Sequence, residues 1–153
     1  MLADELDLPS FLGAGLAVIV ATSDDRLRPE VSRAWGPLLA ADGGTLTMCV
    51  AAAPASTMRA NLGRGGTIAA TFSVPTTYRT VQLKGPLLSV EEPSADDLAR
   101  VEEHVAAFAE EVARVGIPAT RAPRLREPAL LAVQMEVRER YDQTPGPGAG
   151  SPL

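Results

Sequence analysis

Few side chains in this sequence have the type and spacing that enzymes use for acid, base or nucleophilic chemistry. The chain contains one histidine, His104, and one cysteine, Cys49, so neither a histidine cluster nor a cysteine-rich metal site can form. The sequence motifs of serine hydrolases, zinc proteases, dithiol oxidoreductases and P-loop proteins are all missing. We therefore predict neither a catalytic side chain nor a metal site.

His104 and Cys49 both have structural interpretations. His104 lies between the apolar residues Val101 and Val105 of a predicted helix, and we expect it to face solvent or to make a contact at a helix end. Cys49 stands between Met48 and Val50 in a predicted strand, where a cysteine usually behaves as a small buried hydrophobic residue.

The segment 55–62, Ala-Ser-Thr-Met-Arg-Ala-Asn-Leu, is better suited to binding an anion. Ser56, Thr57 and Arg59 lie near the start of a helix that we predict over residues 54–62. Free backbone N–H groups and the helix dipole attract a phosphate at such a position, and an arginine can hydrogen-bond to it. The alternative is a plain helix cap made by Ser56 or Thr57.

Length and composition predict one ordinary folded domain. The chain has 153 residues, of which 46% are hydrophobic and 22% are charged, as in proteins that bury a core. Its net charge of −5 argues against nucleic-acid binding, which needs clustered Lys and Arg. The longest apolar run, 16–21, is too short to span a membrane, and the N-terminus lacks the basic region of a signal peptide. We expect a cytoplasmic protein.

The elements that must position these residues are mostly short strands. Alternating or β-rich runs predict strands at 16–22, 29–35, 45–50, 67–74, 78–90 and 131–137, with a short helix at 2–14. The turn at 42–44, Asp-Gly-Gly, favours a hairpin, and Gly85-Pro86 predicts a bend in the long fifth strand. Six strands that are mostly antiparallel predict a mainly β protein, a small barrel with flanking helices.

One long helix is predicted over residues 94–115. Ser94 is a good N-cap, and Asp97 stands where a capping box places an acid. The apolar stripe consists of Leu98, Val101, Val105, Phe108, Val112 and Val115. We assign residues 1–141 to a single domain and residues 142–153 to a Gly/Pro-rich C-terminal tail, which is either disordered or folded over a neighbouring subunit.

The order of these features resembles the FMN-binding split-barrel family, the pyridoxamine 5'-phosphate oxidase-like group. The similar features are a Pro-containing second strand (28–33), a Gly turn, a third strand, Ser56 followed by Asn61-Leu62, and the strand 78–85 with Gly85 at its end. The tail is similar to that of an uncharacterised bacterial branch. The resemblance extends from about Leu16 to Gly150 and implies a six-stranded antiparallel split barrel.

The resemblance also implies a cofactor and its site. Members of the family are homodimers that hold two FMN molecules in clefts between the subunits. By position, the cofactor-binding residues are Arg33 and Trp35 on the second strand, Met48, Cys49 and Val50 through their backbone groups, Ser56, Thr57 and Arg59 at the phosphate, and Thr80, where the oxidases often have Gln.

Two departures from the family pattern shape the functional prediction. Thr57-Met58 replaces the Arg-Lys pair of the oxidases, with Arg59 one residue further on, and the tail lacks their basic substrate-binding residues. We therefore do not expect pyridoxal-phosphate synthesis. The predicted function is an FMN-dependent oxidoreductase with a small-molecule substrate. The alternatives are a non-catalytic flavin- or haem-binding carrier or sensor, and a deazaflavin (F420)-dependent reductase.

Overall fold

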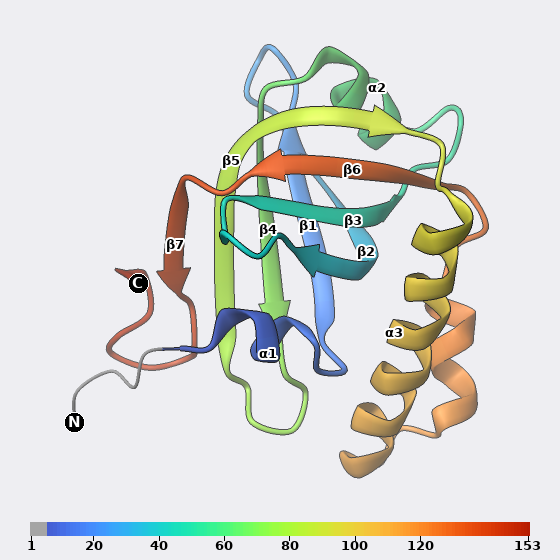
Figure 1. Ribbon diagram of the computed structural model, residues 1–153, viewed down its shortest axis with the longest axis vertical. Coiled ribbons are helices and arrows are strands. Elements are labelled where there is room, and N and C mark those ends of the chain that lie inside the picture. Colours follow the sequence, from blue (N-terminus) through green and yellow to red (C-terminus); the bar gives the residue numbers. More distant parts are fainter. Residues whose placement is uncertain (1–5) are drawn as a thin grey trace.

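Six antiparallel strands close into a barrel, as the computed structural model shows for residues 6–153 (Figure 1). The barrel strands are β1 (Ala17–Ser23), β2 (Pro29–Leu39), β3 (Thr45–Ala51), β4 (Thr67–Ser73), β5 (Thr80–Glu91) and β6 (Leu130–Glu136). Their order is β4–β1–β2–β3–β6–β5, and β5 pairs back with β4. The predicted six-stranded antiparallel barrel with flanking helices is confirmed.

The fifth strand bends where the sequence predicts it. Residues of β5 up to Pro86 pair with β4, whereas residues from Leu87 onward pair with β6. Gly85 at this bend is buried, and a Cβ atom on it would lie 1.8 Å from the carbonyl oxygen of Glu136. The close approach of two backbones therefore requires glycine at this position.

The barrel interior is filled almost entirely by aliphatic side chains. Alternate residues of each strand point inward, for example Val18 and Val20 of β1 and Ala70 and Phe72 of β4, and all four are at most 2% exposed. This alternation is the period of two that the sequence pattern predicts for strands with one buried face.

Helix α3 (Ala95–Arg114) packs on the outside of β2 and β3 and forms a second, smaller core. Its N-terminus carries the predicted capping box of Ser94 and Asp97. Phe108 lies against the indole of Trp35, with ring centroids 5.8 Å apart. The stripe is shorter than predicted, because Leu98 and Val115 are 39% and 46% exposed.

The prediction for His104 is wrong. The side chain is not at a solvent-facing position, because only 7% of the residue is exposed and its imidazole packs beside Trp35. The reason is its spacing: His104 lies three residues after Val101 and four before Phe108, so it belongs to the buried face of α3.

The remaining elements close the ends of the barrel. Helix α1 (Leu8–Leu12) is the described part of the predicted N-terminal helix, since residues 1–5 lie outside the described residues. Helix α2 (Thr57–Arg64) begins three residues later than predicted. The 3-10 helix η1 (Ala119–Leu125) and the short strands β7 (Glu139–Asp142) and β8 (Ser151–Pro152) were not predicted.

The tail folds back on its own barrel. β7 pairs with the first half of β5, and β8 pairs with β7. Thr144 adds a side-chain contact, because its Oγ1 accepts a hydrogen bond of 3.0 Å from the backbone N–H of Thr80. Among the described residues, every helix is too short or too polar to cross a membrane.

Candidate functional site

The start of α2 has backbone hydrogen-bond donors that the helix itself does not use. The first intrahelical bond runs from the N–H of Ala60 to the carbonyl of Ser56, so the N–H groups of Thr57 and Met58 precede it and have no partner within the helix. Thr57 is exposed. These groups and the positive end of the helix dipole favour an anion at this position.

The hydroxyl of Ser56 is used to shape this turn. Its Oγ donates to the carbonyl of Ala53 at 2.7 Å and accepts from the N–H of Arg59 at 3.1 Å. Ser56 is therefore the N-cap, as the structural alternative predicts. The cap is compatible with an anion at the helix start, because it satisfies the N–H of Arg59 and leaves those of Thr57 and Met58 without a partner in the helix. Thr57 is exposed, whereas Met58 is 2% exposed.

Three buried side chains fix α2 against the barrel. Asn61 and Thr22 are 1% and 8% exposed, and Asn61 Nδ2 donates to Thr22 Oγ1 at 3.1 Å. The same hydroxyl donates to the sulfur of Met58 at 3.5 Å. These polar contacts lie in an apolar environment, where hydrogen bonds that are satisfied favour a single arrangement of the side chains. They therefore hold the start of α2 in one orientation.

Arg59 is oriented by the backbone of the preceding loop. Its Nε donates to the carbonyl of Ala52 at 3.1 Å, which leaves the two terminal nitrogens of the guanidinium for another acceptor. Among residues 6–153, Arg59 has no acidic side chain within ion-pair distance, whereas Arg28, Arg100 and Arg126 each have one. An arginine held in this way can bind a carboxylate or phosphate in a bidentate manner.

Arg33 lies on β2 in the part of the barrel that faces outward beside β1. Two rows of paired residues cross this face, each with one residue from β2, β1, β4 and β5 in that order. The first row is Val31, Ala21, Ala69 and Lys84. The second row is Arg33, Ile19, Thr71 and Gln82. Ile19 and Val31 are 36% and 63% exposed, so this part of the face is open in the single chain. Arg33 is half-buried among these residues.

The predicted site residues of β3 lie in the middle of the sheet. Met48, Cys49 and Val50 are at most 1% exposed. Cys49 pairs with Trp35 of β2 on one side and with Ala132 of β6 on the other. The backbone of β3 is therefore paired with a neighbouring strand on both edges. Burial raises the pKa of the Cys49 thiol to about 11, and the residue is a protonated core side chain.

Trp35 and Thr80 are also apart from the α2 turn. The indole of Trp35 is 2% exposed beneath α3. Thr80 begins β5 and pairs with Ser73, at the end of β4 that is remote from α2. Its hydroxyl lies 2.9 Å from that of Ser73. The structure therefore brings together Ser56, Thr57 and Arg59 and distributes the other six predicted residues over the sheet.

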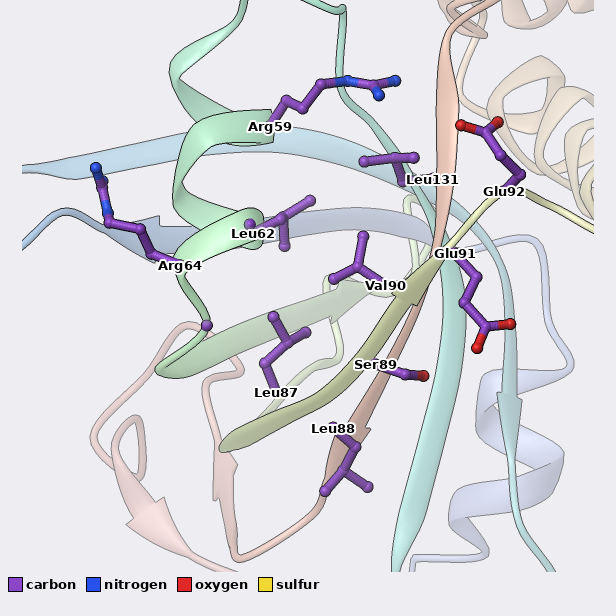
Figure 2. Close-up of a pocket in the computed structure, with 12 residues that line it drawn as sticks. Arg59, Leu62, Arg64, Leu87, Leu88, Ser89, Val90, Glu91, Glu92 and Leu131 are labelled. Carbon is purple, nitrogen blue, oxygen red and sulfur yellow. The ribbon is translucent and has the colours of Figure 1, made fainter.

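An open groove runs along α2 on the side of Arg59 (Figure 2). It has a volume of about 680 Å³ and lies between α2 and the second half of β5. The side chains of Leu62, Leu87 and Val90 converge on its floor, while Arg59 extends over one end. Sequence reasoning did not find this groove, because its residues come from three distant segments of the chain.

Comparison with known proteins shows the fold. No protein-family model matches the sequence, and no curated protein matches it significantly. Among solved structures, a chain described as F420 Reductase is 17% identical, with a TM-score of 0.57 over 86% of this chain and 93% of that one. HupZ of Group A Streptococcus is 15% identical, with a TM-score of 0.53 over 93% and 95% of the two chains.

A pyridoxamine 5'-phosphate oxidase-related, FMN binding protein from Nostoc punctiforme also matches. It is 13% identical over 88% of this chain and 77% of that one, with a TM-score of 0.46. The similarity of the barrel to F420 Reductase over most of both chains confirms the split-barrel fold that the sequence resemblance implies.

Proposed function

We propose that this protein binds FMN at a homodimer interface and uses the flavin in an oxidoreductase reaction. The observation that carries the proposal is the start of α2, where backbone N–H groups without a helical partner and Arg59 lie together on one capped turn. The sequence resemblance to FMN-binding split barrels supports a flavin phosphate as the anion. The shared fold with a chain described as F420 Reductase supports a cofactor of the flavin type.

The residues at the turn fit a phosphate. In this proposal the N–H groups of Thr57 and Met58 and the hydroxyl of Thr57 donate to the phosphate, and Arg59 or Arg33 supplies the positive charge. Ser56 acts indirectly, because its hydroxyl already bonds to Ala53 and to the N–H of Arg59. Its role is to hold the first turn in the orientation that exposes the other donors.

The open outer face supports the homodimer. Ile19 and Val31 are exposed aliphatic residues among the small side chains of Ala21 and Ala69, and such a surface is typical of a contact between subunits. In the proposed dimer Arg33, which lies in the row of Ile19, belongs to this interface. The flavin ring would lie between subunits. Met48 and Val50 would support the strands from inside the barrel, and Trp35 and Cys49 would support them from beneath α3.

When bound, FMN would supply the redox chemistry by accepting and releasing electrons. The residues of this chain bind the phosphate, orient the flavin and exclude water from the interface. Cys49 and His104 take no part in proton transfer in this proposal. Burial raises the pKa of the Cys49 thiol to about 11 and lowers the pKa of the His104 imidazole to about 4, so both are neutral and enclosed under α3.

The retained cofactor tests this proposal against its alternatives. Purified protein is incubated with FMN, F420 or haem, freed of unbound ligand by gel filtration, and examined by absorbance. We expect FMN to be retained. Retention of F420 alone would favour the deazaflavin reductase, to which the barrel is similar in fold. Retention of haem alone would favour the haem-binding carrier or sensor.

A further inference from the structure

We propose that the groove between α2 and the second half of β5 is a ligand site for an amphiphilic anion. The ligand is an apolar chain or ring that carries one carboxylate or phosphate group. The apolar part lies on the groove floor, and the anionic group binds the guanidinium of Arg59. This site goes beyond the FMN site proposed above: the two share Arg59, and binding in the groove requires no bound FMN.

The floor of the groove is one end of the barrel core. Leu62 and Leu131 are 2% and 5% exposed, and Leu87 and Val90 pack partly buried against the same cluster. The barrel opens here because β5 leaves β4 after Pro86 and crosses to β6. The volume of about 680 Å³ lies within the range of small-molecule sites, and the lining combines these aliphatic side chains with charged ones, as an amphiphilic ligand requires.

Arg59 supplies the polar group that orients a ligand. Its Nε is fixed by the carbonyl of Ala52, and its terminal nitrogens extend across the upper end of the groove (Figure 2). Arg59 is half-buried and has no acidic partner among the described residues, so its guanidinium can donate to an anion, because Arg donates paired hydrogen bonds to carboxylate and phosphate oxygens.

The other charged residues restrict the ligand to a single anionic group. Figure 2 shows Glu92 across the groove end from Arg59, and Glu91 directed away from the floor. These carboxylates would repel a second anionic group on the same ligand at short range. The guanidinium of Arg64 points away from the floor and bonds to Asn61 Oδ1, which leaves Arg59 as the cation over the groove among the described residues that line it.

Titration by NMR tests the site directly. Shifts of the backbone amides of the ¹⁵N-labelled protein without FMN are followed during addition of octanoate, octyl phosphate or octanol, which share one apolar chain. We expect saturable shifts at Leu62, Leu87 and Val90 with octanoate or octyl phosphate, and at least about tenfold weaker binding of octanol. The tighter of the two anions identifies the head group. Equal affinities for all three probes, shifts elsewhere, or no saturation would overturn the proposal.

Two arginines of the same helix provide the matched variants. Arg59→Ala should weaken octanoate binding about ten- to a hundredfold, the usual effect of losing a charge-assisted hydrogen bond, whereas Arg64→Ala should change it much less. Glu92→Gln should strengthen octanoate binding. Equal losses of octanoate affinity in the two arginine variants would contradict the assignment of Arg59 as the anion-binding residue. Binding of FMN is measured separately, so a protein that binds octanoate and not FMN keeps this site and loses the function proposed above.

Discussion

The backbone N–H of Gly36 donates a hydrogen bond of 3.0 Å to Nδ1 of His104. This contact joins the bulge of β2 to the middle of α3, since the register of β2 with β3 shifts between Trp35 and Leu38. Gly36 has a φ of +62°, and a Cβ on it would lie 3.1 Å from the backbone N of Val101. The position of α3 over the barrel thus depends on a glycine and a neutral histidine.

The Gly36–His104 contact makes stability depend on pH. Burial lowers the pKa of His104 from 6.5 to about 4, and the nearby carbonyl of Leu16 opposes this shift only in part. The unfolded chain therefore binds a proton below pH 6.5 that the folded chain does not. The contribution of the neutral His104 to the free energy of unfolding is complete above pH 6.5. It is lost as the pH falls from 6.5 to 4, and the loss is about 3 kcal/mol at most.

Chemical denaturation of wild type and His104→Asn at several pH values measures this effect. The Asn amide can still accept from Gly36 and does not titrate, so its free energy of unfolding should be nearly flat between pH 6.5 and 4. Burial raises the pKa of Asp97, but hydrogen bonds from Ser94 and the neighbouring Arg100 lower it below its usual value. The stabilising contribution of Asp97 is therefore lost only at lower pH. A wild-type curve as flat as that of the variant would contradict the buried neutral imidazole.

Phe108 should contribute strongly to the packing of α3. It is 5% exposed and lies edge-on to Trp35. Phe108→Ala should lower the free energy of unfolding by about 3–5 kcal/mol. Glu110→Ala, on the exposed face of the same helix, is the control and should change it by less than about 0.5 kcal/mol. A melting temperature equal to wild type in Phe108→Ala would show that the stripe does not hold the helix.

Gly85 should be the least replaceable glycine of the barrel. A Cβ at this position would lie 1.8 Å from the carbonyl oxygen of Glu136, so Gly85→Ala should destabilise by roughly 3 kcal/mol or more. A Cβ at Gly63 in α2 would have no heavy atom of the described residues within 4 Å beyond its own helix backbone, so Gly63→Ala should stabilise by up to about 1 kcal/mol. Equal melting temperatures for the two variants would contradict the close approach at the bend.

A charge on the open face should dissociate the proposed dimer. Val31 is 63% exposed in the single chain, so Val31→Glu leaves the core of the monomer intact and places a carboxylate in the interface. Light scattering at micromolar concentration should give a dimer mass for wild type and for Leu88→Glu, an exposed aliphatic residue elsewhere, and a monomer mass for Val31→Glu. A monomer mass for wild type would contradict the proposed dimer interface and the FMN site that the proposal places in it.

Local patterns in the sequence predict most of the fold. The six barrel strands follow from alternation, the bend follows from Gly85-Pro86, and the ends of α3 follow from Ser94 and Gly116. The pattern does not predict β7 and β8, because these strands are only four and two residues long and carry no periodicity. The pairing of Tyr141 with Gln82 joins segments that are far apart in the sequence.

The sequence predicts the site less completely for a similar reason. The cap and Arg59 are local features, so the α2 turn could be found from residue types alone. The burial of Met48, Cys49 and Val50 between two neighbouring strands, and that of Trp35 under α3, depends on which segments pair. His104 shows the same limit: its spacing indicated the buried face, and its polar type led to the wrong prediction.

The central claim is that the start of α2 holds the phosphate of FMN, and the ratio of riboflavin to FMN affinity tests it most directly. Both ligands carry the same ring, so titrations of wild type, Arg33→Ala and Arg59→Ala isolate the phosphate. We predict that wild type binds FMN about ten- to a hundredfold more tightly than riboflavin, and that one arginine variant loses most of this preference. Equal affinity of wild type for FMN and riboflavin would contradict the phosphate site.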